Sequence, residues 1–102
     1  MPVTESSSPA GVEGAAGSSV TVLVRYFAAA RAAAGSDEES VTVDSPATVA
    51  AVIDAITVRH GEALARVLTR CSYLLGATAV HELSTPVSVG DQLDVLPPFA
   101  GG

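Results

Sequence analysis

The sequence predicts a single α+β domain in which a small sheet packs on one main helix. Short segments in which apolar residues dominate or alternate occur near both ends of residues 20–102, which is typical of strands. One longer segment between them repeats its apolar residues at helical spacing. The 102 residues are 48% apolar and only 4% aromatic, so we expect one core built from Val, Leu, Ile and Ala.

The beginning of the chain differs from the rest. Residues 1–18 are mainly Ser, Gly, Ala and Pro and show no apolar periodicity. Such a segment cannot bury enough apolar surface to offset the entropy lost on ordering, so we predict a disordered extension. The folded domain is predicted to cover residues 19–102 and to end in a flexible tail, residues 97–102.

The domain is predicted to begin with a strand, a short helix and a second strand. Residues 20–27 (VTVLVRYF) are apolar on most of both faces, which favours a central position in the sheet. The alanine-rich segment that follows ends at Gly35, so a short helix is expected. Residues 36–39 (SDEE) are interpreted as an acidic loop, and residues 40–44 (SVTVD) as a short strand.

The main helix is predicted to begin at Ser45 and Pro46. Ser45 is a good N-cap residue, and a proline is tolerated at the first helical position because its missing N–H has no partner there. Arg59 and His60 suit the last turn, and Gly61 can close the helix. The apolar stripe that faces the sheet is formed by Val49, Val52, Ile53 and Ile56.

The remaining elements are shorter. Residues 62–70 (EALARVLTR) predict a second helical piece, and Gly90-Asp91 a turn. Pro97 and Pro98 should stop the last strand, because neither residue can donate a hydrogen bond to a neighbouring strand. Three short strands are predicted here, at residues 71–75, 79–80 and 93–96.

The charge composition narrows the possible partners. The formal net charge is −6, and all five basic residues are arginines. This argues against nucleic acid, whose binding requires clustered positive charge. No apolar run is long enough to span a membrane, and no secretory signal is recognisable. The single cysteine, Cys71, cannot form an internal disulfide, so we expect a reducing compartment, the cytoplasm.

The sequence offers no self-contained active site. His60 and His81 have no Cys, His or carboxylate at metal-ligand spacing. Cys71 lies in an apolar segment without an activating base, which favours core packing over nucleophilic catalysis. Several carboxylates are interpreted as loop or turn residues: Asp37, Glu38 and Glu39 in a solvated turn, and Asp91 and Asp94 flanking the last strand.

The end of the chain carries the clearest functional signal. Two prolines favour an extended backbone, and the six residues of the tail span about 20 Å when extended. Gly101 and Gly102 have no Cβ and can thread a narrow channel in a partner. The terminal carboxylate would then be a reactive group at the end of an extended segment. Two glycines alone would be a weak signal; the prolines and Phe99 before them strengthen it.

Residues 20–102 resemble the MoaD family, the small subunit of molybdopterin synthase. The segment LDVLPPFAGG resembles the family's C-terminus, VTVLVRYFAAARAAAG its first strand and short helix, and TVAAVIDAI with RHG its main helix. The resemblance implies a ubiquitin-like β-grasp fold, with the first and last strands parallel in the middle of a mixed sheet. It also implies a partner-binding surface that consists of Phe27, Arg31, Leu96, Pro97, Pro98, Phe99 and Ala100.

The same resemblance implies the chemistry. Gly102, preceded by Gly101, would be adenylated and converted to a thiocarboxylate, whose sulfur would pass to cyclic pyranopterin monophosphate. The chain would bind no cofactor itself, since the activating enzyme uses the ATP. The implied partners are a MoaE-like large subunit, which would supply the catalytic side chains, and an E1-like adenylyl and sulfur transferase similar to MoeB.

Two other functions are alternatives to the molybdopterin role. A sulfur carrier for thiamine or cysteine synthesis would use the same tail chemistry, although residues 62–70, Phe99 and the two prolines favour the molybdopterin group. A ubiquitin-like module that modifies or binds other proteins is the other alternative. An iron–sulfur β-grasp protein is excluded, because a cluster needs several thiolates and this chain has one cysteine.

Overall fold

The computed structural model describes residues 18–98. Residues 1–17 of the predicted extension and residues 99–102 of the tail lie outside the described residues. The Ser18 carbonyl accepts a hydrogen bond from the Ser45 backbone N–H at 3.0 Å, so ordered pairing begins one residue before the predicted domain boundary. The elements in chain order are β2 (Ser19–Tyr26), α1 (Ala28–Ala34), β3 (Glu38–Asp44), α2 (Val49–His60), α3 (Glu62–Leu68), β4 (Ser72–Leu75), β5 (Thr78–Ala79) and β6 (Gln92–Leu96).

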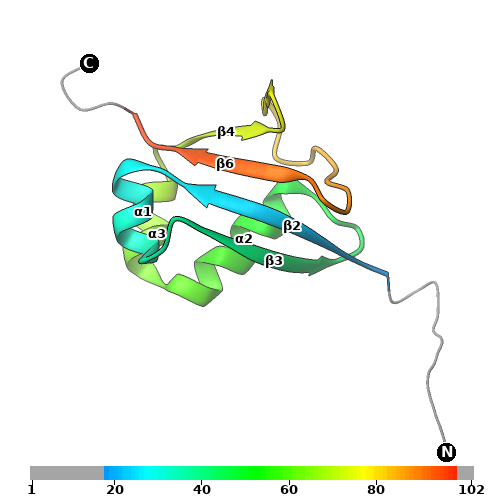
Figure 1. Ribbon diagram of the computed structural model, residues 1–102, viewed down its shortest axis with the longest axis horizontal. Coiled ribbons are helices and arrows are strands. Elements are labelled where there is room, and N and C mark those ends of the chain that lie inside the picture. The colour runs from blue at the N-terminus through cyan, green and yellow to red at the C-terminus, as the bar shows by residue number, and fades with distance from the viewer. Residues whose placement is uncertain (1–17, 99–102) are drawn as a thin grey trace, which may run out of the picture.

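The strands form one mixed sheet in the order β3-β2-β6-β4-β5. The central pair, β2 and β6, is parallel, whereas β2 with β3, β6 with β4 and β4 with β5 are antiparallel. The predicted β-grasp arrangement, with the first and last strands parallel in the middle, is therefore confirmed. Because the central strands run the same way, β2 starts at the end of the sheet opposite to the one where β6 finishes (Figure 1).

Within residues 18–98, helices cover only one face of the sheet, and they lie behind it in Figure 1. Along β2 the residues Val22, Val24 and Tyr26 are buried, while Leu23 and Arg25 on the other face are half-buried. The expectation that this strand lies centrally in the sheet is confirmed, since β2 is flanked by β3 and β6. The residues of β2 on the open face are exposed or half-buried, although Leu23 among them is apolar.

The core lies between the covered face of the sheet and the helices. Val, Leu and Ile supply most of it, as predicted, but Tyr26 and Tyr73 add two buried aromatic rings. The Tyr73 hydroxyl donates to the Leu68 carbonyl at 3.3 Å, which satisfies its polar end within the core. The buried apolar residues are Val22, Val24, Tyr26, Ala30, Val41, Val43, Val49, Val52, Ile56, Leu64, Leu68, Tyr73, Val87, Leu93 and Val95.

Helix α2 begins later than predicted. The N-cap is Thr48 rather than Ser45, and its Oγ1 accepts a hydrogen bond from the Ala51 N–H at 3.1 Å. The peptide bond between Ser45 and Pro46 is cis and lies before the helix. Two other N–H groups of the first turn donate to a loop remote in sequence: Val49 to the Thr85 carbonyl at 2.9 Å and Ala50 to the Leu83 carbonyl at 2.8 Å. The Thr48 side chain and this long-range loop together therefore satisfy the N–H groups at the start of α2.

The predicted acidic loop is also shorter than expected. Strand β3 begins at Glu38, because Glu38 and Glu39 pair in register with Arg25 and Val24 of β2. Pairing with a neighbouring strand overrides the weak strand propensity of glutamate. The change matters because strand alternation turns Glu38 and Glu39 to opposite faces of the sheet.

Candidate functional site

The site is the place where the chain leaves the sheet, which we call the tail root, Pro97 and Pro98. The parallel register pairs Tyr26 with Val95, so Phe27 and Leu96 follow side by side at the ends of the two central strands. Leu96 and Pro97 are half-buried and Pro98 is exposed. The fold thus brings Phe27 and the tail root together, as the sequence predicted, while Phe99, Ala100, Gly101 and Gly102 lie outside the described residues.

Phe27 occupies a sharp turn between β2 and α1. It has extended backbone angles, and its carbonyl accepts hydrogen bonds from the N–H groups of Ala30 at 3.0 Å and Arg31 at 3.3 Å. The next residue, Ala28, has a φ of 51°, in the left-handed region that residues with a Cβ adopt at a cost. This turn leaves the Phe27 ring half-buried at the edge of the open face.

An ion pair on the open face supports Phe27. Arg25 Nε lies 2.9 Å from Asp94 Oδ1, and Arg25 NH2 lies 3.2 Å from Oδ2, which makes a bidentate pair. The Arg25 guanidinium is also 5.3 Å from the centroid of the Phe27 ring. The hydrogen bond to Asp94 raises the pKa of Arg25. Asp94 is therefore a buried partner within β6, not a residue flanking the strand as predicted.

Arg31 is held more loosely. Its NH1 lies 3.7 Å from Asp37 Oδ1, and both side chains are more than half exposed. A pair of this kind contributes little to stability because solvent screens it. Arg31 is exposed and its N–H donates to the Phe27 carbonyl, so the fold places this member of the predicted surface one helical turn from Phe27.

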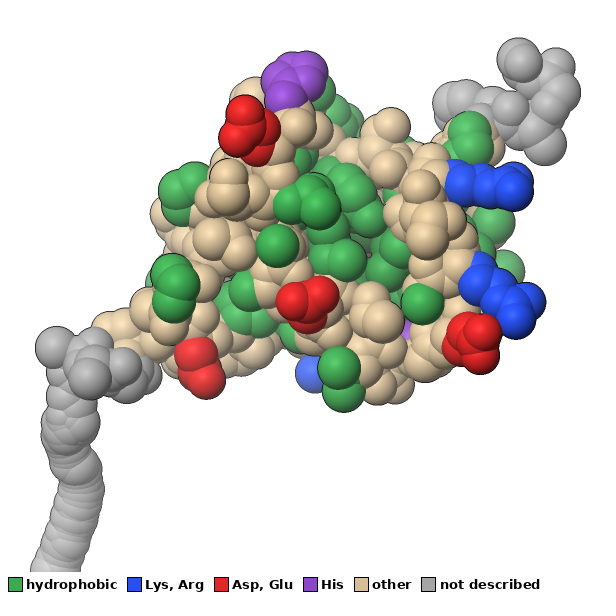
Figure 2. Space-filling view, turned by 180° about the vertical axis from the view of Figure 1, so that it is seen from behind, with side chains coloured by type: hydrophobic (Ala, Val, Ile, Leu, Met, Phe, Trp, Pro, Cys, Tyr) green, Lys and Arg blue, Asp and Glu red, His purple; other side chains and the backbone are tan. Residues whose placement is uncertain are grey.

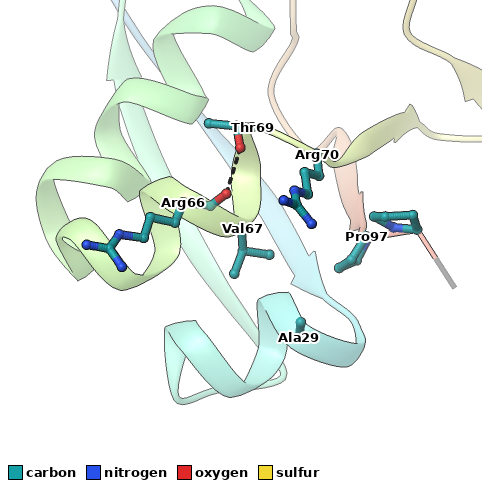
Figure 3. Close-up of a pocket in the computed structure, with 7 residues that line it drawn as sticks. Ala29, Arg66, Val67, Thr69, Arg70 and Pro97 are labelled. Atoms are coloured by element: carbon teal, nitrogen blue, oxygen red, sulfur yellow. Dashed lines mark hydrogen bonds between the residues drawn. The ribbon is translucent and has the colours of Figure 1, made fainter. Parts of the chain in front are cut away.

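A groove opens on the helix side of the tail root. It has a volume of about 630 Å³. Figure 3 shows Val67 of α3 and Pro97 on opposite sides of it, with Ala29 of α1 between them. Among the predicted surface residues within 18–98, Pro97 and Pro98 line this groove, whereas Phe27, Arg31 and Leu96 do not. The other lining residues, which sequence reasoning missed, are Ala29, Arg66, Val67, Thr69 and Arg70.

The sequence contained one signal for this groove. Arg66 and Arg70 are four residues apart in a predicted helical segment, a spacing that places two side chains on the same helix face. What could not be predicted is that the end of this segment lies against the tail root. That proximity comes from the packing of α3 on α1 beside β6.

A second cluster of titratable residues joins β2, β3 and the end of α2. Glu39 Oε2 accepts hydrogen bonds from the Tyr26 hydroxyl and from His60 Nε2, each at 2.5 Å, and Oε1 accepts from Arg59 at 2.8 Å. The Tyr26 and His60 rings meet edge to face, with centroids 5.9 Å apart. The prediction that Glu39 belongs to a solvated turn was wrong, because its side chain is only 16% exposed.

The protonation behaviour of this cluster follows from its contacts. Burial alone would raise the pKa of Glu39, but hydrogen bonds from Tyr26, His60 and Arg59 outweigh it, so the pKa of Glu39 is lowered. Burial, followed by the hydrogen bond to Glu39, raises the pKa of Tyr26. Tyr26 therefore stays a neutral donor and Glu39 a charged acceptor, which indicates a structural cluster that ties β2, β3 and α2 together.

The described residues offer no other chemical centre. Within residues 18–98, no three His, Cys, Asp or Glu side chains are grouped so that they could hold a metal ion. Cys71 is half-buried, its thiol donates to the Val67 carbonyl at 3.2 Å, and burial raises its pKa. It is thus a packed thiol rather than an activated nucleophile. In the same part of the chain, no helix is both long and apolar enough to cross a bilayer.

The chain has the fold of a ubiquitin-like β-grasp protein. Its mixed sheet has a parallel central pair, helices cover one face, and the tail root follows the end of β6. Solved structures of such proteins are similar to this chain. The small archaeal modifier protein SAMP1 from Haloferax volcanii is 31% identical, with a TM-score of 0.72 over 80% of this chain and 99% of that one.

Two complexes also contain similar chains. One comes from the complex of subunits 1 and 2 of the molybdopterin-converting factor from Helicobacter pylori, at 26% identity and a TM-score of 0.60, covering 81% of this chain and 100% of that one. The other comes from the BexX/CysO complex of Amycolatopsis orientalis, at 28% identity and a TM-score of 0.60, covering 79% and 99%. A search of curated proteins gave no match.

The ThiS family model matches residues 24–102. The chain therefore belongs to the ThiS family, within the MoaD/ThiS superfamily of ubiquitin-like sulfur carriers and modifiers. The resemblance to the MoaD family that the sequence suggested is confirmed at this level.

Proposed function

We propose that this chain is a cytoplasmic sulfur carrier of molybdopterin biosynthesis and that Gly102 carries the sulfur. The observation that supports this most directly is the parallel pairing of β2 with β6, which brings Phe27 beside the tail root. The ThiS family match continues through Gly101 and Gly102. A similar chain from H. pylori occurs in a molybdopterin-converting factor, in complex with a second subunit.

The proposed chemistry takes place on the carboxylate of Gly102. In an E1-like activating enzyme, a carboxylate oxygen attacks the α-phosphorus of ATP, which releases pyrophosphate and leaves an acyl adenylate. A sulfur donor at the oxidation level of sulfide then displaces AMP and forms the thiocarboxylate. The adenylate is needed because a carboxylate is a poor electrophile, whereas AMP is a good leaving group.

The second stage takes place in the large subunit of molybdopterin synthase. The thiocarboxylate sulfur forms a bond to a carbon of cyclic pyranopterin monophosphate as a carbon–oxygen bond at that carbon breaks, and the displaced oxygen leaves with the electron pair of that bond and takes up a proton. Water then cleaves the acyl carbon–sulfur bond, which leaves the sulfur on the pterin and returns Gly102 to a carboxylate. The described residues of this chain would bind and orient rather than react: Phe27, Leu96 and the tail root contact the partner, and Arg25 holds Phe27. Fixing the nucleophile on a docked tail reduces the entropic cost of the transfer.

The first test is the mass of the intact protein. We expect that incubation with the activating enzyme, ATP and a sulfur donor increases the mass by the difference between one sulfur and one oxygen atom. A variant that lacks Gly101 and Gly102 should keep its fold and gain nothing. If the intact chain keeps its original mass while a known carrier is converted in parallel, the carrier proposal fails.

A second candidate function comes from the likeness to SAMP1, the small archaeal modifier protein 1. A modifier would use the same activated Gly102 but would form an amide with another protein. The two functions separate after activation: a carrier yields thiocarboxylate and supports sulfur transfer with the large subunit, whereas a modifier yields covalent adducts of higher mass.

A further inference from the structure

The groove at the tail root combines an apolar floor with positive charge. Val67, Ala29 and the two prolines supply the apolar part, and Arg66 and Arg70 the charge. The floor is open because α1 contributes only small side chains around Ala29. A partner residue of moderate size could therefore enter without displacing a side chain of this chain.

Arg70 differs from the other four arginines. Arg25, Arg31, Arg59 and Arg66 each lie within 4 Å of a carboxylate of their own chain, namely Asp94, Asp37, Glu39 and Glu62. Arg70 has no such partner among residues 18–98 and is exposed. In a chain with a net charge of −6, an unpaired guanidinium beside the tail root is a marked local exception.

The orientation of the side chains supports a role in binding. Figure 3 shows Arg70 extending toward the space between Val67 and Pro97, whereas Arg66 extends away from Pro97. Arg66 is bound to Glu62 at 3.2 Å, but both side chains are 78% exposed, so this pair can be exchanged at little cost. Figure 2 shows basic side chains gathered at this end of the helix face, beside the tail root.

We propose that this groove binds an acidic segment of the protein that receives the tail. One carboxylate of that segment pairs with Arg70, and a neighbouring apolar side chain packs on Val67 and Pro97. Arginine suits this role because its planar guanidinium binds a carboxylate through two hydrogen bonds. The identity of the receiving protein rests on the proposed function; the chemistry of the groove does not.

The test uses a probe that needs no sulfur chemistry. The full chain, labelled with nitrogen-15, is titrated with the peptide acetyl-Gly-Glu-Leu-Glu-Gly-amide while backbone amide shifts are followed. The control peptide has Gln in place of both Glu residues. We expect the acidic peptide to shift the amides of Ala29, Val67, Thr69 and Arg70, and the control peptide to bind at least about tenfold more weakly.

Variants separate a specific contact from general electrostatics. Arg70→Glu should weaken the acidic peptide at least about tenfold, while Arg70→Lys should retain most of the binding. The matched control is the double variant Val58→Glu and Val89→Glu, at residues 85% and 76% exposed, which changes the net charge by the same amount elsewhere. This control should bind like the wild type.

Three results would overturn the proposal: no shifts at the groove, equal binding of the two peptides, or equal losses in Arg70→Glu and the double variant. The outcome is independent of the mass measurement above. A chain that accepts no sulfur but binds the acidic peptide at the groove would remove the proposed function and leave this inference standing.

Discussion

Glu39 shows how one carboxylate can fix the relative positions of several elements. Its two oxygens accept hydrogen bonds from Tyr26 on β2 and from Arg59 and His60 at the end of α2. Sequence reasoning placed all three carboxylates of the segment SDEE in solvent, because local composition gives no sign of which one turns inward. Strand alternation decides this, and the register of β3 on β2 was not readable from the sequence.

We expect Glu39→Gln to lower the free energy of unfolding by about 1–3 kcal/mol at neutral pH, since the donors around this half-buried group lose its charge and one of its two acceptor oxygens. The folded-state pKa of Glu39 lies below its ordinary value of 4.5, so its ionised form stabilises the fold. That contribution is complete above the unfolded-state pKa and is lost as pH falls through the lower folded-state pKa. The difference between wild type and variant should therefore shrink below about pH 4.5. Urea denaturation across this pH range measures it.

Glu38→Gln is the matched control for this prediction. Glu38 is the neighbouring residue of β3 and is exposed, and the substitution removes the same charge. Its effect on the free energy of unfolding should stay within about 0.5 kcal/mol. If both variants lose the same stability, or if the Glu39→Gln difference persists in acid, the account of the cluster is wrong.

At the scale of elements, the predicted and observed helices and strands agree best where the apolar periodicity of the sequence is strong. The first strand, the alanine-rich helix closed by Gly35 and the stripe of α2 were predicted because each depends on residues close in sequence. Helix starts and strand starts were less accurate. The start of α2 depends on carbonyls of residues 83–85, and the start of β3 on pairing with β2. Neither contact is encoded locally.

The N-cap of α2 offers a test of this element. Thr48→Ala removes the hydrogen bond from Ala51 N–H to Oγ1 and should cost about 1 kcal/mol of unfolding free energy. Thr78→Ala is the control, since Thr78 is exposed on the short strand β5. It should change stability by less than about 0.5 kcal/mol. The unfolding free energies are measured by denaturant titration. If Thr48→Ala loses no more than Thr78→Ala, the carbonyls of residues 83–85, not Thr48, maintain this helix start.

At the scale of the whole molecule, the candidate site is a product of topology. The predicted surface combined residues near position 27 with residues near position 97, and the parallel pairing of β2 with β6 brings these regions together. The resemblance to a known family supplied that expectation, because nothing in local composition says which strands are neighbours. The groove beside α3 was missed for the complementary reason: the spacing of Arg66 and Arg70 does not say what lies next to them, and only packing places them at the tail root.

The last prediction concerns the open face of the sheet and its part in binding a partner. Phe27 lies at the end of β2 and is half-buried. The centroid of its ring is 5.3 Å from the Arg25 guanidinium, which is itself bound by Asp94 of β6. An aromatic ring fixed before binding loses little entropy when a partner covers it, so it suits an interface anchor. Phe27→Ala should therefore weaken binding to the large subunit of molybdopterin synthase by about tenfold or more.

Leu83→Ala provides the comparison, because Leu83 is a large apolar residue, 49% exposed, in the loop at the start of α2. Its loss should leave the affinity within about twofold of the wild type, since a contact outside an interface contributes nothing to binding. Calorimetric titration measures both affinities, and denaturation of each variant shows whether the fold is retained. Loss of stacking on Arg25 should cost Phe27→Ala about 0.5–1 kcal/mol of stability. A folded Phe27→Ala protein with unchanged affinity would remove Phe27 from the docking surface and would leave the groove beside Arg70 as the surface next to the tail root.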